Sequence, residues 1–507
     1  MTSNHDRPGM PDKRSKQGRQ TTFRESDGCI VPLKLEDQSS GRKPGNAGGG
    51  KAARLSRDRD RAPSVHRDGI AVLTRLDRIT QRAETQPEAV FNNLFSLLNF
   101  ELLWHAFRRL KRGKVPGVDG VTVEAYEANL RSNLNDLLQR LHRGSYRPRP
   151  SLRKNIPKGN GKTRPLGIAC VEDKLVQRAV VMILERIYEV DFDDNSYGFR
   201  PGRSCHQALS VLGQHIATKK VNWISDADIK GFFDNVSHER LVDLLRLRIS
   251  DPKLLALISR FLKAGVMIEG QLQATDEGVP QGASLSPLLA NVYLHYVLDQ
   301  WFERDVKPRM RGEAFLIRFA DDFICCFERE DDARKYQTVL PKRLGRYSLT
   351  VAEEKTKLIR FGRFARRDCQ RHGAGAPETF DFLGFTHYCG LSRAGRFKLK
   401  RKTSTKKLRI KLLDLKRWFN QQLSTPIAEM WPTLNAKLRG HYQYYGINDN
   451  WPLLMVYREQ ARWMAKRHMS RRSQNSYLNW QKFNTFEKQH PLASPRRLTD
   501  LIAMSRR

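Results

Sequence analysis

Two short segments of the sequence carry aspartates in a pattern that suits metal-dependent chemistry on phosphates. The first is AFLIRFADDFICCFE, residues 314–328, in which Asp321 and Asp322 stand between two apolar runs. Two such runs around a tight turn are typical of a β-hairpin, so we expect both acids at its tip. Neighbouring carboxylates in apolar surroundings are costly unless a cation lies between them, and carboxylate oxygens suit Mg²⁺. An ordinary turn with two solvated acids is the alternative.

The second acidic segment is VNWISDADIKGFFDN, residues 221–235. In an extended strand Asp226 and Asp228 face the same side, and Lys230 with Gly231 indicates a turn after the strand. Two carboxylate-bearing strands can hold two Mg²⁺ ions, one activating an attacking hydroxyl and the other stabilising a leaving pyrophosphate. We therefore expect aspartates from both segments to surround a pair of ions, an arrangement that favours nucleotidyl transfer.

A basic hairpin lies upstream of both acidic segments. Residues 156–167 read as a strand, a Gly-Asn-Gly turn and a second strand, with cations at Lys158, Lys162 and Arg164. Arginine can bind two phosphate oxygens at once and lysine supplies a compact charge, so the hairpin could hold a triphosphate. A solvated hairpin or a contact to an RNA backbone would use the same residues.

Nine motifs occur along the chain in a fixed order, from about residue 113 to about residue 480. They are GKVPGVDGVT (113–122), IPKGNGKTRPLGIACVEDKLVQ (156–177), SYGFRPGRSCHQAL (196–209), DIKGFFDNVSH (228–238), GVPQGASLSPLLANVYL (278–294), FADD (319–322), LTVAEEKTKL (349–358), FDFLGF (380–385) and LNAKLRGHYQYYG (434–446). In this order they make the sequence resemble the group II intron reverse transcriptases that carry a maturase domain.

The resemblance implies an RNA-directed DNA polymerase that uses two Mg²⁺ ions, with Asp228, Asp321 and Asp322 as catalytic residues. It places Asp226 as an additional nearby charge and Asp234 as a structural acid. The implied metal ligands are Asp228, Ile229, Asp321 and Asp322, and the implied nucleotide-binding residues are Lys158, Arg164, Phe233 and Gln281. The remaining implied residues bind RNA: Arg200, Arg203, Lys437 and Arg439.

Two aromatic positions of the resembled pattern bear on the reaction. Phe233 would lie beneath the sugar of the incoming nucleotide, where its ring would collide with a 2′-hydroxyl and so favour deoxynucleotides. Phe319 stands where the family usually has tyrosine, so a hydroxyl near the primer end is missing. In the downstream motif, Lys355 or Lys357 could approach the leaving pyrophosphate.

The elements that must position these residues imply an α+β fold. We expect the fingers and palm of a right-hand polymerase, with an antiparallel palm sheet, followed by an α-helical thumb and maturase domain. The expected divisions are a disordered basic extension (1–65), fingers and palm (66–390), a helical RNA-binding region (391–480) and a short basic tail (481–507). Apolar residues at 91, 94, 98, 102 and 107 predict one buried helical stripe, and residues 126–142 predict a second helix.

Composition points to a polyanionic partner. The chain has 507 residues, a net charge of +37 and a pI near 10.2, and residues 391–507 hold 26 Lys and Arg against 6 Asp and Glu. So much unbalanced positive charge suits nucleic acid. A membrane surface is the rival, but no run reaches the roughly 18 apolar residues that span a bilayer.

The cysteines indicate a reducing compartment. Seven scattered cysteines form neither paired CxxC spacing nor an obvious disulfide framework, so we expect a cytoplasmic bacterial protein. Many members of the resembled family carry a C-terminal HNH nuclease module built around cysteine pairs. We expect this chain to lack one.

The expected partners are group II intron RNA, template RNA, a DNA primer, dNTPs and target DNA, with no membrane; a homodimer is left open. The expected function is reverse transcription joined to maturase activity in splicing and retrohoming. Two alternatives stay open: a catalytically silent RNA-binding splicing factor, and a reverse transcriptase recruited to phage defence or CRISPR adaptation. The intact Asp228, Asp321, Asp322 and Arg164 argue against the first, and the maturase-like segment argues against the second.

Overall fold

The computed structural model of the chain describes residues 65–157, 163–268, 270–373, 375–472, 478–496 and 498–504. The expected N-terminal extension, residues 1–65, therefore lies almost wholly outside the described residues. None of the helices in these ranges combines the length and apolarity that a membrane crossing requires.

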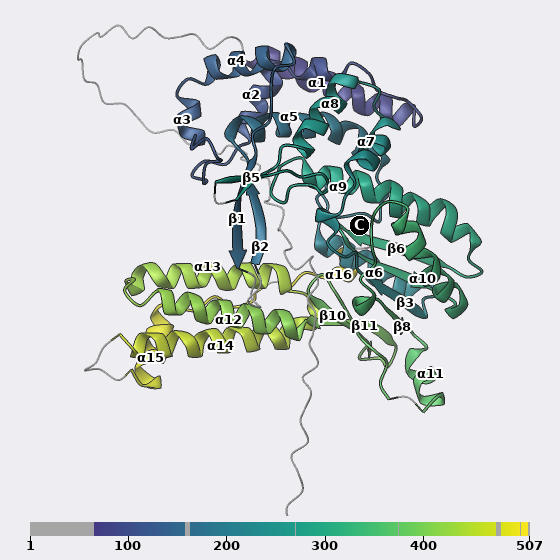
Figure 1. Cartoon of the computed structure of the whole chain (residues 1–507). Helices are drawn as coiled ribbons and strands as arrows, with labels where there is room; N and C mark the ends of the chain where they lie inside the picture. Colours follow the sequence, from purple (N-terminus) through teal and green to yellow (C-terminus); the bar gives the residue numbers. More distant parts are fainter. Residues whose placement is uncertain are drawn as a thin grey trace, which may run out of the picture.

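A helical unit forms the upper part of the molecule in Figure 1. Its members are α1 (Val65–Thr85), α2 (Phe100–Arg108), α3 (Val123–Glu127), α4 (Leu130–His142), α5 (Val171–Asp191), α7 (His238–Arg246) and α8 (Pro252–Leu262). The central helix α5 is contacted by α1 and α2 and buries a nearly continuous apolar surface that includes Leu175, Ala179 and Ile183. A helix that is apolar on most of its faces belongs in the core, as α5 does here.

The predicted single stripe from 91 to 107 is wrong as one helix, although all five of its residues are buried. Phe91 pairs with Ile249 in an isolated parallel bridge, and residues Leu94–Leu97 form a 3-10 turn. The helix itself begins at Phe100, where the side chain of Asn99 accepts a hydrogen bond from the Leu102 amide. An asparagine cap stops the helix from extending upstream, and spacing alone does not show such a stop. The predicted helix 126–142 is likewise split into α3 and α4.

Two sheets follow in the fingers and palm. The fingers sheet has the order β2-β1-β4-β5, with bounds Thr163–Ile168, Ser151–Pro157, Val266–Ile268 and Gln271–Gln273. The palm sheet has the order β6-β7-β3-β8, with bounds Ala314–Phe319, Asp322–Phe327, Trp223–Ala227 and Lys357–Arg360, and all its pairings are antiparallel. Strands β1 and β2 form the predicted hairpin and extend from the helical unit toward α13 (Figure 1).

Helices pack on the palm sheet: α6 (Cys205–Thr218) contacts β6, and α10 (Glu330–Gly345) contacts β3 and β7. This part of the chain also forms α9 (Ser286–Leu294) and the short α11 (Ala365–Arg371). Helix α9 starts at Ser286 and Pro287 and continues into a π-helical turn at His295–Asp299 and another at Phe302–Val306. Such turns often mark functional sites, because the extra residue redirects the side chains that follow.

The expected boundary at residue 390 cuts through a sheet. Strands β9 (Phe380–Phe382), β10 (Phe385–Leu391) and β11 (Phe397–Thr403) pair in the order β11-β10-β9. Because β10 and β11 pair along seven residues, this part of the fold ends at about residue 403. The helical region starts there.

The C-terminal region consists of α12 (Thr405–Gln421), α13 (Ile427–Tyr445), α14 (Trp451–Ser470), α15 (Trp480–Gln489) and α16 (Leu501–Met504). Residues 481–507 were expected to be a basic tail, but their described part packs against the rest: Phe483, Leu492 and Leu501 are buried. Helix α16 contacts α6, and the Ser210 hydroxyl donates to the Leu501 carbonyl. The C-terminal segment therefore links the helical region to the palm.

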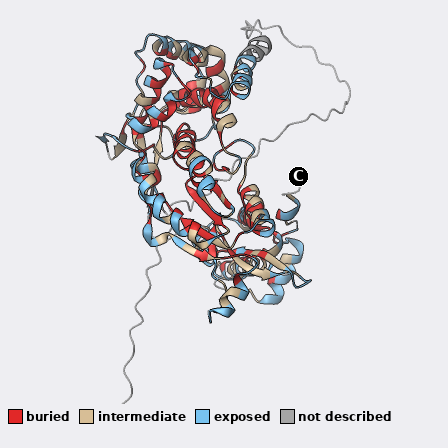
Figure 2. Cartoon of the chain, turned by 90° about the vertical axis from the view of Figure 1, so that its right-hand side faces the viewer, coloured by how far each residue is buried: buried red, intermediate tan, exposed pale blue. Residues whose placement is uncertain are grey.

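Buried residues form two apolar clusters (Figure 2). One fills the helical unit and one face of the palm sheet, and the other joins the opposite face to the C-terminal helices. Alternate residues of β7 divide between them: Cys325 and Phe327 face the first cluster, and Ile324 and Cys326 the second. A sheet packed on both faces is a rigid support for groups at its ends.

Candidate active site

The hairpin formed by β6 and β7 carries two of the predicted catalytic aspartates at its tip. Phe319 pairs with Asp322, which leaves Ala320 and Asp321 as the turn. Ala320 has a φ of 58°, a left-handed conformation that costs a non-glycine residue about 1 kcal/mol or more. Both aspartates are buried, each 6% exposed. The predicted hairpin is thus confirmed, and its turn is tight and strained.

The register of the palm sheet brings the second acidic segment to the same end of the strands. Strand β3 pairs with β7 from Trp223 opposite Phe327 to Ala227 opposite Phe323. One further step would place Asp228 opposite Asp322. On the other side of β3, Asp226 pairs with Lys357, and two further steps would place Asp228 opposite Lys355. Residues from three segments therefore meet in a row.

Asp228 is the most buried carboxylate of this row, at 1% exposed. Its Oδ2 accepts a hydrogen bond from Lys355 Nζ at 2.8 Å, and its backbone carbonyl accepts from the Ala352 amide. Its Oδ1 is buried and has no hydrogen-bond partner among the described residues. A buried carboxylate oxygen without a donor is unfavourable, so it is a natural ligand for a cation. This geometry fits a Mg²⁺ ion.

Carboxylates alone do not complete a metal site. Within the described ranges, no group of three His, Cys, Asp or Glu side chains is arranged to hold a metal ion. Mg²⁺ commonly uses one or two carboxylates together with water and the substrate's phosphates, so an incomplete set is compatible with its chemistry. The side chain of Ile229 is buried in the core, which leaves only its backbone carbonyl as a ligand. The roles of Asp228, Ile229, Asp321 and Asp322 stay predictions.

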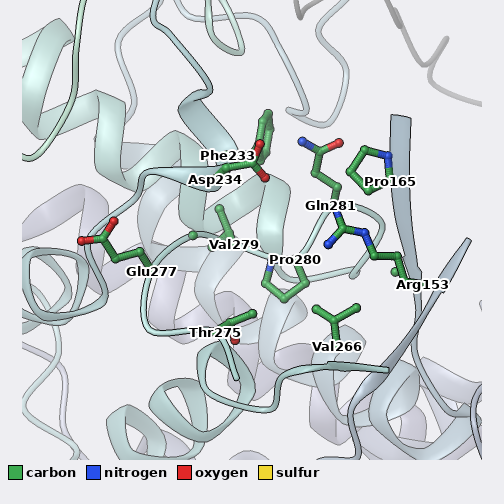
Figure 3. A pocket seen from close by; sticks show the side chains of 12 residues that line it. Arg153, Pro165, Phe233, Asp234, Val266, Thr275, Glu277, Val279, Pro280 and Gln281 are labelled. Carbon is green, nitrogen blue, oxygen red and sulfur yellow. The ribbon is translucent and has the colours of Figure 1, made fainter. Parts of the chain in front are cut away.

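A cavity of about 320 Å³ lies between β1, β2 and the residues that follow β3, and its lining does not include Asp228, Asp321 or Asp322. Its lining includes two predicted nucleotide-binding residues, Phe233 and Gln281, which lie at the same end of the cavity (Figure 3). Two residues of β2 line it as well: Pro165, which directly follows Arg164, and Gly167. The structure thus brings three of the predicted nucleotide-binding segments together.

Gly282 lets the loop before α9 lie directly against β2. Gly282 has a φ of 105°, and a Cβ there would lie 2.6 Å from Leu166 Cδ1 and 2.7 Å from the Gly167 carbonyl oxygen. The Gly167 amide donates to the Gln281 carbonyl at 2.7 Å. The loop before α9 can therefore pack directly on β2 only with glycine at 282.

The side chains of Lys158 and Arg164, the two other predicted nucleotide contacts, lie outside the described part of the structure. Lys158 lies outside the described residues, and so does Lys162. Arg164 is within β2, where its backbone pairs with Ile156, but nothing is described of its side chain. The basic hairpin is confirmed as a hairpin, and its contacts with a triphosphate stay predictions.

Arg200 differs from its expected role as an RNA contact. Its guanidinium is buried, pairs with Glu189 at 3.0 Å, and donates to the carbonyls of Asp193 and Ser196. A buried guanidinium with these partners is not available to a phosphate, so this assignment is wrong. The Phe-Arg-Pro-Gly pattern did not show that a helix-end acid lay within reach. Arg203 is more accessible, although it pairs with Asp194 at 2.7 Å.

The predicted RNA contacts in the C-terminal region lie at the surface. Lys437 and Arg439 are exposed on α13, and the Lys437 ammonium lies 5.2 Å from the centre of the Trp418 ring. Most aromatic residues here belong to the core. Trp451 and Trp463 are exceptions, at 43% and 47% exposed, and the Arg467 guanidinium lies over Trp463.

Sequence reasoning missed several residues of the site. Arg153 of β1 lines the cavity opposite β2, because Arg153 pairs with Gly167 in the register. Glu277 and Thr275, in the loop between β5 and α9, also line it. The alternation of β1 could have identified Arg153. The loop residues carried no pattern that places them.

Comparisons with known proteins agree with this geometry. A family model described as reverse transcriptase (RNA-dependent DNA polymerase) matches residues 156–387. The group II intron-encoded protein LtrA of Lactococcus lactis subsp. cremoris is 34% identical over 317 residues, which cover 58% of this chain and 53% of LtrA. Protein YkfC of Escherichia coli (strain K12) is 38% identical over 242 residues, which cover 42% of this chain and 64% of YkfC.

A plant relative matches a smaller part. Nuclear intron maturase 2, mitochondrial, of Arabidopsis thaliana is 30% identical over 180 residues, covering 28% of this chain and 24% of the relative. The chain therefore spans about half of LtrA and less than two thirds of YkfC. Together with the antiparallel palm sheet, the family match confirms the predicted α+β fold.

Proposed function

We propose that the chain is an RNA-directed DNA polymerase that also binds intron RNA as a maturase, because residues 156–387 match the reverse transcriptase family model and the chain is 34% identical to a group II intron-encoded protein. The observation that supports polymerisation best is the palm register, which continues from Ala227 opposite Phe323 toward Asp228 opposite Asp322, together with the hydrogen bond from Lys355 to Asp228.

In this proposal Asp228, Asp321 and Asp322, at the ends of the inner palm strands, bind the metal ions that hold the primer end and the incoming nucleotide. Two Mg²⁺ ions, when bound, would activate the primer 3′-hydroxyl and stabilise charge on the pyrophosphate. The protein holds the carboxylates rigidly, because both strands belong to a sheet that is buried on two faces. Burial also excludes water from Asp228.

The cavity would receive the incoming dNTP. Phe233 would lie against its sugar and Gln281 near its base or the template, while Arg164 and Lys158 would contact its phosphates. Arg153 adds a further cation to the same wall. The ring of Phe233 in this lining suits a nucleotide with no 2′-hydroxyl.

The maturase function would depend on the region after residue 403. Its helices present Lys437 and Arg439 on an exposed surface, where Lys437 lies beside the half-buried Trp418 ring and Arg467 lies beside the exposed Trp463 ring. Arginine, lysine and accessible aromatic rings together suit structured RNA. Group II intron RNA, template RNA, a DNA primer, dNTPs and target DNA are the proposed partners, and splicing and retrohoming are the proposed processes.

Primer extension on an RNA template with Mg²⁺ tests the polymerase. The wild type should give full-length cDNA, and Asp321→Asn should give none, because the amide removes a negative charge without changing shape. Asp305→Asn is the matched control, since Asp305 is an exposed acid away from the site. Equal products from wild type and Asp321→Asn, or no product from either, would reject the assignment. Splicing of a group II intron in low Mg²⁺, with and without the protein, tests the maturase.

A further inference from the structure

Arg318 is the largest fully buried side chain of the described residues, and it stands two positions before the catalytic turn. Its Nε and Nη2 donate to Asp299 Oδ1 and Oδ2 at 2.7 and 2.5 Å. Its Nη1 donates to Asn291 Oδ1 at 2.9 Å and to the Ala320 carbonyl at 3.0 Å. A buried guanidinium needs such partners, because an unpaired charge in the interior is strongly destabilising.

The fourth contact joins this buried cation to the catalytic turn. The Ala320 carbonyl belongs to the peptide bond whose nitrogen is that of Asp321. Ala320 is in a strained left-handed conformation, so this peptide needs a neighbour that holds it in place. A rotation of the peptide would move the Asp321 carboxylate relative to Asp228. The guanidinium therefore acts on the one bond that orients Asp321.

Asn291 connects the same cation to a second segment. Its Nδ2 donates to the Gly198 carbonyl at 2.7 Å, while its Oδ1 accepts from Arg318. Gly198 lies directly on the turn, since a Cβ there would be 2.1 Å from the Ala320 amide nitrogen. The segment around Gly198 also pairs with the Arg318 backbone: the Arg318 amide donates to Asn195, and the Tyr197 amide donates to Arg318.

Asp299 reaches Arg318 because of the local helix geometry. It is the last residue of the π-helical turn His295–Asp299, which follows α9. Asn291 lies on α9 itself, two turns earlier. The helix thus supplies both the neutral and the charged partner of one guanidinium, and a local change of helical pitch lies between them.

We propose that Arg318 is a positioning residue for metal binding: through the Ala320 carbonyl it fixes Asp321 where Asp228 and Asp321 can share a divalent cation. This rests on the proposed polymerase function. The contact to Asp299 supplies the charge balance, and the contact to Asn291 sets the plane of the guanidinium. Arg318 touches no substrate, so its effect passes through Asp321.

The test compares Arg318→Lys with a matched variant. Arg248 is also buried, is held by both oxygens of Asp191 at 2.8 and 3.0 Å, and donates to two carbonyls, but it lies in the helical unit. Lysine keeps the charge at either site and loses the planar fork. Mn²⁺ binding is followed by electron paramagnetic resonance, and hydrogen exchange reports on the turn at residues 319–322.

We expect Arg318→Lys to weaken Mn²⁺ binding by about 10-fold or more, because losing a group that orients a metal ligand typically costs about 10- to 100-fold in metal affinity. Exchange at the turn should accelerate, and primer extension should require more Mg²⁺. Arg248→Lys should lose comparable thermal stability with unchanged Mn²⁺ affinity. Equal Mn²⁺ affinity in wild type and Arg318→Lys, or equal weakening in both variants, would overturn the proposal.

Asp299→Asn provides a second variant of nearly the same shape, with the same expected weakening. If neither Arg318→Lys nor Asp299→Asn folds, the network is required for folding and the positioning role is rejected. If the wild type binds Mn²⁺ but makes no cDNA, the polymerase assignment fails while the positioning result still stands on binding and exchange.

Discussion

At the scale of single residues, the ion pair between Lys355 and Asp228 should stabilise the folded protein when no metal ion is bound. The Lys355 ammonium bonds to one oxygen of a carboxylate that is 1% exposed. Lys355→Met would leave Asp228 buried without its cation, so the free energy of unfolding without metal should fall by about 3 kcal/mol or more. Mg²⁺ should then raise the melting temperature more than it does in the wild type. Differential scanning calorimetry with and without Mg²⁺ measures both effects.

Lys307→Met is the control for that experiment. Lys307 pairs with Glu303 at 2.6 Å, but both side chains are partly exposed, so its loss should cost about 1 kcal/mol or less. A similar loss in both variants, with the same response to Mg²⁺, would show that Lys355 does not compete for the metal ligand.

A second residue-scale prediction concerns the sugar. Phe233 lines the cavity, and its ring packs edge-on against Phe199 at 6.4 Å between centroids. Phe233→Val should remove the barrier to a 2′-hydroxyl and reduce the preference for dNTP over rNTP by about 10- to 100-fold. Steady-state primer extension with each nucleotide gives the ratio of kcat/KM values. Phe364→Val, at an exposed ring, should leave that ratio unchanged.

At the scale of elements, the loop before α9 packs so closely on β2 that a side chain at position 282 would disturb both. Gly282→Ala would strain a φ of 105° and push Leu166 and Gly167 away. We expect about 1 to 3 kcal/mol of strain and a higher KM for dNTPs, because the displaced strand lines the cavity. Titrating dNTP in primer extension measures the KM.

Gly345→Ala is the matched control, since a Cβ at this helical glycine meets no atom within 4 Å. That variant should keep the wild-type KM and gain up to about 1 kcal/mol of stability. If Gly282→Ala matched it in both respects, the loop would not shape the nucleotide cavity.

Elements marked by a clear local pattern were predictable from the sequence. Two apolar runs around a tight turn predicted the β6 and β7 hairpin, and a Gly-Asn-Gly turn between two short strands predicted that of β1 and β2. The helix near residue 100 was not predicted correctly, because a side-chain cap at Asn99 overrides the apolar spacing. The π-helical turn after α9 has no sequence period that would reveal it, so the link between Asp299 and Arg318 also went unnoticed.

At the site, residue types were predictable but partners were not. The sequence showed which aspartates could bind a metal, since carboxylates between apolar runs are unusual. It did not show that Arg200 is neutralised by Glu189, because that contact depends on how α5 ends against the following loop. It also did not show that Asp228 is held by Lys355, since that depends on strand register.

At the scale of the whole molecule, charge is the dominant property. With a net charge of +37, RNA affinity should fall steeply as salt rises, through release of counterions. Arg439→Gln should weaken binding to structured RNA at each salt concentration and reduce the slope of log K against log salt by about 1. Filter binding from low to high salt measures this slope.

Arg246→Gln is the control for charge, because Arg246 is exposed on α7 and pairs with Asp243. Its slope should equal that of the wild type. If the two variants had the same slope, the exposed surface of α13 would not be the RNA contact.

The central claim is that the acidic segments around Asp228 and Asp321 meet at one divalent cation site, at the ends of the inner palm strands. Fe²⁺ in place of Mg²⁺, with ascorbate and peroxide, generates hydroxyl radicals that cut the chain near the bound ion. We expect cuts both at residues 226–230 and at residues 319–323, suppressed by excess Mg²⁺ and absent in Asp228→Asn. Cuts at only one of these segments, or at neither, would contradict the shared site.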